Sequence, residues 1–153
     1  MRRIILTTIL TLVLYSVYSQ KSERQYMSDA EKVAIDWLNK LNNKKYNQCW
    51  YMLDKTTKDK TNFDDWNTYF RAELMPELGD FIDRKYYLAE IETEVENLPK
   101  GLYVSVHYTS NYSNTQTASE FILLGLTKPE GRWHVLSYFA EYQLINDAGD
   151  LPD

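Results

Sequence analysis

The chain has 153 residues, of which 44% are hydrophobic and 14% aromatic, and its formal net charge at pH 7 is −5. This length and apolar content suffice for one domain with a buried core. The acidic balance argues against a nucleic-acid binder, which needs a basic patch to displace counterions from phosphates.

The first nineteen residues have the pattern of a signal peptide. Arg2 and Arg3 supply a positive start, residues 4–17 an apolar run, and residues 17–19 small side chains at the −3 and −1 positions of a cleavage site. A membrane-spanning helix needs about 20 apolar residues, which this run does not reach. We therefore predict a periplasmic or secreted protein, cleaved near Ser19-Gln20, with no transmembrane segment after cleavage. Retention of the segment as an anchor is the alternative.

Three helices are predicted after a polar leader at residues 20–27. Ser28-Asp29-Ala30-Glu31 has the pattern of a capping box, and apolar residues then recur every three or four positions as far as Leu41. The other two helices are expected at residues 45–53 and from Thr61 to about Leu74, with a polar loop at residues 55–60 between them.

Large apolar side chains lie on one face of each predicted helix. Trp37, Trp50 and Trp66 occupy these faces, and we expect them to pack against a sheet. Cys49, the only cysteine, shares the face of the second helix. Neither histidine is near it in sequence and no activating motif surrounds it, so we interpret it as a buried, inert thiol.

From Arg84 onward the apolar period changes to two, which predicts strands. Four are expected, at about residues 84–96, 102–109, 115–127 and 133–142. The short links between them favour an antiparallel meander. Residues 28–142 are thus predicted to form one α+β domain, with three N-terminal helices packed on a curved four-stranded sheet, followed by an acidic flexible tail at residues 143–153. A strongly bent sheet of this kind forms the cone of the NTF2-like or cystatin-like folds.

Several short motifs, in this order, resemble the DUF4019 family of small exported bacterial domains of unknown function. They extend over about residues 33–139 and comprise Ala34, Trp37, Tyr46, Trp50, Trp66, Pro76-Glu77-Leu78-Gly79, Arg84, Gly101-x-Tyr103-Val104, Tyr108, Glu120 and Gly131-x-Trp133-x-Val135-x-x-Tyr138. The chain departs from the family pattern at Met75, where an Arg is usual, and at Ser137, where a Gly is usual. The resemblance implies an NTF2-like fold but no known reaction.

Two sets of polar residues are interpreted as solvated surface. Glu90, Glu92, Glu94 and Glu96 project from one face of a predicted strand, and a straight row of carboxylates does not converge on a metal ion. His107 alternates with Val106 and is expected to face solvent. No metal site and no cofactor is predicted.

Candidate pocket or structural-pair residues are Arg71, Arg84, Tyr103, Tyr108 and Glu120. A charge that reaches into an aromatic core must be paired or must titrate. One interpretation is a structural Arg–Glu pair that ties the helices to the sheet, and the other is a pair that grips a ligand at the open end of the cone.

The leading hypothesis is an exported, non-catalytic domain that binds a small molecule, peptide or protein partner at the open end of the cone. The alternative is a cofactor-free isomerase, lyase or hydrolase, in which Glu120 acts as a base of raised pKa and Tyr103 or Tyr108 polarises the substrate. A third hypothesis is an assembly subunit that forms a homodimer through an exposed apolar sheet face.

Overall fold

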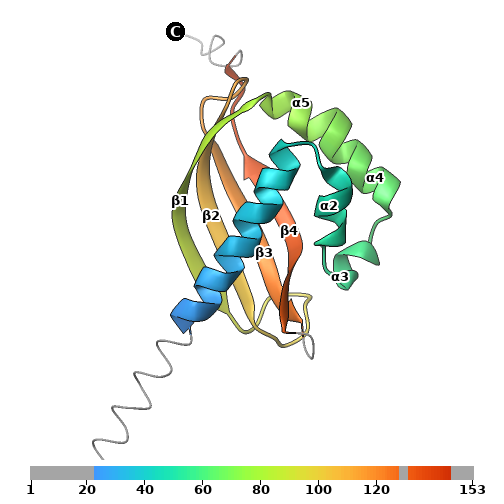
Figure 1. Ribbon diagram of the computed structural model, residues 1–153, viewed down its shortest axis with the longest axis vertical. Coiled ribbons are helices and arrows are strands. Elements are labelled where there is room, and N and C mark those ends of the chain that lie inside the picture. Colours follow the sequence, from blue (N-terminus) through green and yellow to red (C-terminus); the bar gives the residue numbers. More distant parts are fainter. Residues whose placement is uncertain (1–22, 128–130, 146–153) are drawn as a thin grey trace, which may run out of the picture.

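An open antiparallel sheet forms one layer of the computed structural model, and helices cover one of its faces (Figure 1). The structure describes residues 23–127 and 131–145, so the predicted signal peptide lies outside the described residues. The strands are β1 (Phe81–Glu92), β2 (Tyr103–Tyr112), β3 (Ala118–Thr127) and β4 (Arg132–Glu141), paired in the order β1-β2-β3-β4. The predicted α+β class and four-stranded antiparallel meander are confirmed.

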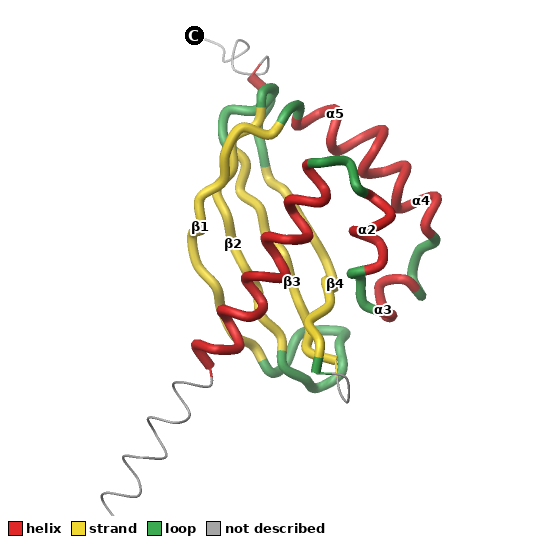
Figure 2. The backbone as a smooth tube through the Cα atoms, in the orientation of Figure 1, coloured by secondary structure: helices red, strands yellow, loops and turns green. Residues whose placement is uncertain are grey.

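The longest described helix, residues 23–42, lies across the sheet (Figures 1 and 2). The shorter helical segments are α2 (Tyr46–Tyr51), α3 (Lys55–Lys58), α4 (Phe63–Thr68), the π-helical η1 (Tyr69–Leu74) and α5 (Met75–Leu78). The last three follow one another without a break. No helix within the described part of the chain is long and apolar enough to cross a membrane.

Two predicted helix boundaries are wrong. The chain is already helical at residue 23, so the helix does not begin at Ser28. The Gln25 side chain donates to Asp29 Oδ1 at 2.9 Å, one turn further on, which favours helix in this polar stretch. The predicted polar loop contains α3, because Asp54 caps it by accepting from the backbone N–H of Thr56 at 2.8 Å.

The first predicted strand is also corrected. It ends at Glu92, so Glu94 lies beyond it and forms an ion pair with Lys100 at 2.7 Å. A register shift between Tyr86 and Leu88 leaves the Tyr87 side chain 71% exposed. A β-bulge of this kind reverses the alternation of side chains between the faces, which the apolar period cannot reveal.

The ends of other strands differ as well. β2 continues through Tyr112, where a loop was expected. Residues 143–145 belong to the ordered domain rather than to a tail, because Leu144 bridges to Thr115 and the N–H of Ile145 donates to the carbonyl of Asn114 at 3.0 Å. The rest of the predicted tail lies outside the described residues.

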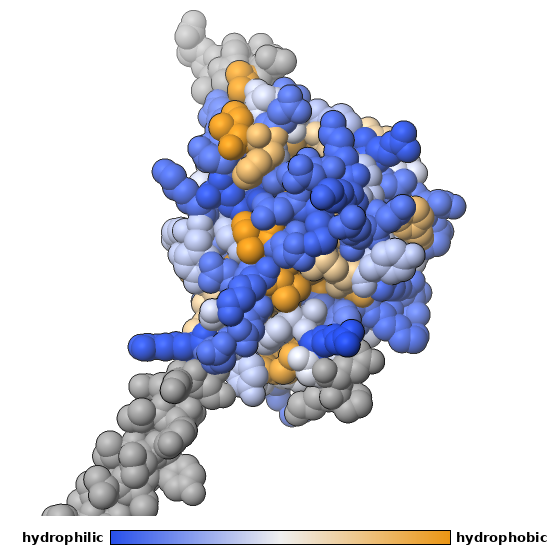
Figure 3. Space-filling model, viewed as in Figure 1, coloured by the Kyte–Doolittle hydropathy of each residue, from blue (hydrophilic) through white to orange (hydrophobic). Residues whose placement is uncertain are grey.

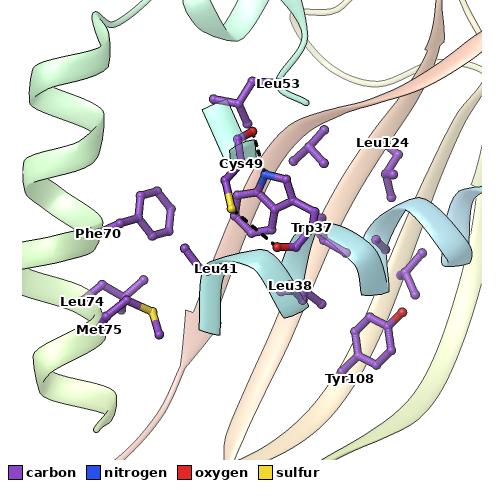
Figure 4. Close-up of a cluster of buried hydrophobic side chains, with 14 of the residues drawn as sticks. Trp37, Leu38, Leu41, Cys49, Leu53, Phe70, Leu74, Met75, Tyr108 and Leu124 are labelled. Atoms are coloured by element: carbon purple, nitrogen blue, oxygen red, sulfur yellow. Dashed lines mark hydrogen bonds between the residues drawn. The ribbon is translucent and has the colours of Figure 1, made fainter. Parts of the chain in front are cut away.

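The core lies between helix 23–42 and the sheet (Figure 4). Trp37 is fully buried, and its ring centroid is 5.3 Å from that of Tyr138 on β4. Trp66 is 9% exposed, and its ring centroid is 4.5 Å from that of Phe70. Trp50 is half-buried, and its ring centroid is 5.7 Å from that of Trp66. The predicted packing against the sheet is confirmed for Trp37, and Trp66 and Trp50 belong to or border the same core cluster.

Cys49 is fully buried within this core. Its thiol lies 3.6 Å from the carbonyl oxygen of Trp37, and the Trp37 indole N–H donates to the Cys49 carbonyl at 3.1 Å (Figure 4). Burial raises the pKa of the thiol to about 12, so little thiolate exists at neutral pH. Its predicted burial is confirmed, and an inert thiol follows from it.

Candidate functional site

A buried ion pair lies on the helix-facing side of the sheet. The Arg84 guanidinium on β1 donates from Nε to Glu120 Oε2 at 2.6 Å and from Nη2 to Oε1 at 3.0 Å. The two side chains are 3% and 1% exposed. Bidentate pairs of this kind combine strong hydrogen bonds with fixed geometry. The pair joins β1 to β3 across β2, rather than tying the helices to the sheet.

Three hydroxyl groups complete the hydrogen bonding of Glu120. Tyr138 and Tyr112 donate to Oε1 at 2.6 and 2.9 Å, and Ser110 donates to Oε2. Burial would raise the pKa of Glu120, but the Arg84 charge and these donors hold it below its ordinary value. Glu120 is therefore ionised and fully engaged, which does not fit the role of a base with raised pKa.

The structure divides the other candidate residues among three places. Tyr108 lies beside the pair, with Arg84 Cζ 5.7 Å from its ring centroid. Tyr103 is on the opposite face of the sheet, where its hydroxyl donates to the carbonyl of Pro99. Arg71 is exposed on η1. The five candidates therefore do not form one site.

A separate open pocket has a volume of about 830 Å³. It lies where the end of helix 23–42, α2 and the start of β1 meet the continuous helix formed by α4, η1 and α5, which we call the α4–α5 helix. Its apolar walls include the rings of Tyr46, Phe63 and Phe81. Four residues with amide side chains also line it, namely Asn42, Asn47, Gln48 and Asn67. The surface over the helices is mainly hydrophilic in Figure 3, with small separate apolar groups.

The charged groups of this pocket are mostly basic. Lys44, Lys45 and Arg71 line it, together with one carboxylate, Asp80. Burial raises the pKa of Tyr46, and the charge of Arg71, which lines the same pocket, opposes that rise. The π-helical turn that carries Arg71 buries Phe70, the residue before it. Turns of this kind are frequent at functional sites.

Two residues connect the pocket with the buried ion pair. Phe81 lines the pocket and also packs on the guanidinium of Arg84, whose Cζ is 4.8 Å from the ring centroid. Asn42 lines the pocket as well, and its Oδ1 is 3.3 Å from the hydroxyl of Tyr112. The ion pair thus supports the floor of the pocket from behind.

Sequence reasoning missed most of these residues. Tyr112 fell between two predicted strands, and Tyr138 was noted as part of the closing family motif. Asn42 and Lys44 stand at the end of a helix, where polar residues are common and carry no signal of a site. The usable signal was Glu120, because it occupies the same strand face as Ile122 and Leu124, which are buried.

A second, smaller pocket of about 580 Å³ lies on the other face of the sheet, among Tyr87, His107, Phe121 and Phe139. His107 lies on this helix-free face, as its alternation with Val106 predicts, but its side chain is only 32% exposed because it packs on Phe121, with ring centroids 5.0 Å apart. Within residues 23–127 and 131–145 no three metal-ligating side chains lie together. A homodimer through this face stays a prediction.

Comparison with protein families gives a match over most of the chain. The model of the family DUF4019, described as a protein of unknown function, matches residues 33–138. That range includes the ion pair and the residues that line both pockets, apart from Phe139 and Glu141. No curated protein and no solved structure matches the chain.

Proposed function

We propose that this chain, which belongs to the DUF4019 family of proteins of unknown function, is a non-catalytic domain that binds a small molecule. The ligand occupies the pocket between helix 23–42, α2 and the α4–α5 helix. The observation that carries this proposal is the pocket itself, which combines aromatic walls with amides and cations.

The size and lining of the pocket support a small ligand. A volume of about 830 Å³ falls within the range of about 300–1,000 Å³ that is usual for ligand sites. Apolar walls supply most of the contact in such sites, while a few polar groups orient the ligand. Tyr46, Phe63 and Phe81 fit the first role, and the amides of Asn47 and Asn67 fit the second.

The buried ion pair supports binding rather than catalysis. Both oxygens of Glu120 are occupied by donors from the sheet, so neither is free to take a proton from a substrate. The same bonds hold Arg84 and Tyr112 in place behind Phe81 and Asn42. A site with a rigid floor loses less conformational entropy when its ligand binds.

The fold is proposed to be the NTF2-like or cystatin-like cone. Helix 23–42 lies across one face of the sheet (Figure 2), and register shifts interrupt β1 twice and β3–β4 once. Such bulges bend strands and increase their twist. A crystal structure with a flat sheet, or with helices on both faces, would overturn this assignment.

A thermal-shift screen against metabolites and cell-wall fragments tests the binding function. A ligand at 100 times its dissociation constant stabilises the folded state by about 2.7 kcal/mol, which raises the melting temperature visibly. The substitution Asn67→Trp fills the pocket and should abolish that rise. Ser119→Trp fills the pocket on the other sheet face and serves as the matched control. A ligand lost in the control variant alone, or no ligand at all, contradicts the proposal.

Export is proposed as the route by which the domain reaches its ligand. Its support is the basic start at Arg2 and Arg3 followed by the apolar residues 4–17. The protein recovered from outside the cytoplasm should begin at Gln20 when its intact mass is measured. A mass that includes residues 1–19 would show instead that the segment is retained.

A further inference from the structure

We propose that the pocket between helix 23–42, α2 and the α4–α5 helix selects an organic anion, whose negative group lies among Lys44, Lys45 and Arg71. This inference rests on the proposed function and names the chemical class of its ligand. Three observations support it: the positive charge of these three residues, which we call the rim of the pocket, the backbone conformation of Lys44, and the aromatic walls of the pocket.

The rim is positive on a protein that is acidic as a whole. Three cations line the pocket against one carboxylate, Asp80, although the chain has a net charge of −5. In the described part of the chain, none of the three lies within 4.0 Å of a carboxylate oxygen. Their charges are therefore not neutralised by ion pairs, and a concave site concentrates their field on an incoming anion.

Lys44 occupies a backbone conformation that lysine rarely adopts. Helix 23–42 ends in a Schellman motif, in which the N–H of Lys45 donates to the carbonyl of Lys40, and that of Lys44 to the carbonyl of Leu41, both at 2.9 Å. The motif places Lys44 at φ +59°, a position usually filled by glycine. The other described residues at positive φ are Asn97, Gly79 and Gly131.

A lysine at this position costs stability relative to glycine, because its Cβ crowds the backbone. Such strain is typical of functional sites, where the side chain has a role that glycine cannot supply. Lys44 is among the residues that line the pocket, and its charge is the property that glycine would remove.

The remaining lining indicates an organic body on the anion. The rings of Tyr46, Phe63 and Phe81 offer apolar surface that inorganic phosphate or sulfate cannot use. We therefore expect a carboxylate, sulfonate or phosphate ester attached to an aromatic or aliphatic body.

Two fluorescent probes with similar rings test this inference. The anion 8-anilinonaphthalene-1-sulfonate should bind more tightly than neutral N-phenyl-1-naphthylamine, and its advantage should shrink as sodium chloride is added. Lys44→Gly should weaken binding of the anion about fivefold, the effect of one charge at about 4 Å in water. The same substitution should raise the melting temperature, because it relieves the strained φ.

Three variants separate charge from shape. Arg71→Gln should weaken binding of the sulfonate probe by a similar factor. Lys44→Arg keeps the charge and should leave the affinity for that probe unchanged. Lys85→Gln removes one positive charge from the opposite face of the sheet and should change the affinity for neither probe.

The outcomes separate this inference from the function on which it rests. If the protein bound both probes equally well and Asn67→Trp abolished both, the result would support ligand binding in the pocket but contradict its selectivity for an anion. Full displacement of the sulfonate probe by equimolar inorganic phosphate would overturn the requirement for an organic body. Failure of both probes to bind, or binding that Asn67→Trp does not affect, would contradict the proposed pocket function itself.

Discussion

Replacing Glu120 with leucine should lower the free energy of unfolding by about 3–5 kcal/mol, because Arg84 would remain buried without a counterion. The hydroxyls of Tyr112 and Tyr138 would lose their acceptor in the same substitution. Urea unfolding followed by circular dichroism measures the loss directly. A midpoint close to that of the parent protein would show that the pair contributes little.

A double variant distinguishes the pair from simple loss of packing. Arg84→Met combined with Glu120→Leu removes both charges, so it should be more stable than Glu120→Leu alone. Glu94→Gln breaks the exposed ion pair with Lys100 and is the matched control. An exposed pair contributes about 0–1 kcal/mol, so the control should change stability little.

Acid should remove the contribution of Glu120 in a defined range of pH. Its pKa in the folded protein lies below the ordinary value of 4.5, because Arg84 and the hydroxyl donors outweigh the effect of burial. The stabilisation is therefore complete above about pH 4.5 and is lost as the pH falls through the folded pKa. Glu120→Gln should flatten this part of the stability profile, and an unchanged slope below pH 4.5 would contradict the role of the carboxylate.

Replacing Trp37 with alanine should have an effect of similar size, about 3–5 kcal/mol. Its side chain is fully buried beside Phe70 (Figure 4), and its ring centroid is 6.0 Å from that of Phe70 and 5.3 Å from that of Tyr138. The substitution leaves a cavity between helix 23–42 and the sheet, which the surrounding side chains can fill only in part.

Two further variants help to explain the loss of stability in Trp37→Ala. Trp37→Phe keeps most of the volume but removes the indole donor, while the N–H of Met52 still donates to the Cys49 carbonyl at 3.1 Å, so the loss should be about 0.5–1.5 kcal/mol. Tyr51→Ala removes a ring that is 77% exposed and should change stability by about 0.5 kcal/mol or less. If Trp37→Ala unfolded at the same urea concentration as Tyr51→Ala, the packing described for the core would be wrong.

The arrangement of helices and strands was largely predictable, because burial of one face imposes a local period. The recurrence of Trp37, Leu38 and Leu41 predicted a helix, and the alternation of Val104 and Val106 predicted a strand. Membership of the DUF4019 family could also be inferred from the order of short motifs. Boundaries failed where partners decide them, as at the β-bulge near Tyr87, since pairing with β2 sets that register.

The candidate site was predictable only in part. Arg84 and Glu120 could be suspected, because charged residues at positions of a buried strand face need partners. The sequence alone therefore determined the class of fold, the buried faces and the presence of charged groups in the core. Only the tertiary structure decided that Tyr112 and Tyr138 satisfy Glu120, and that Lys44 and Arg71 share a different pocket. Contacts such as that of Tyr112 with Asn42 join residues 70 positions apart, and a local pattern contains no information about which distant side chain fills a given space.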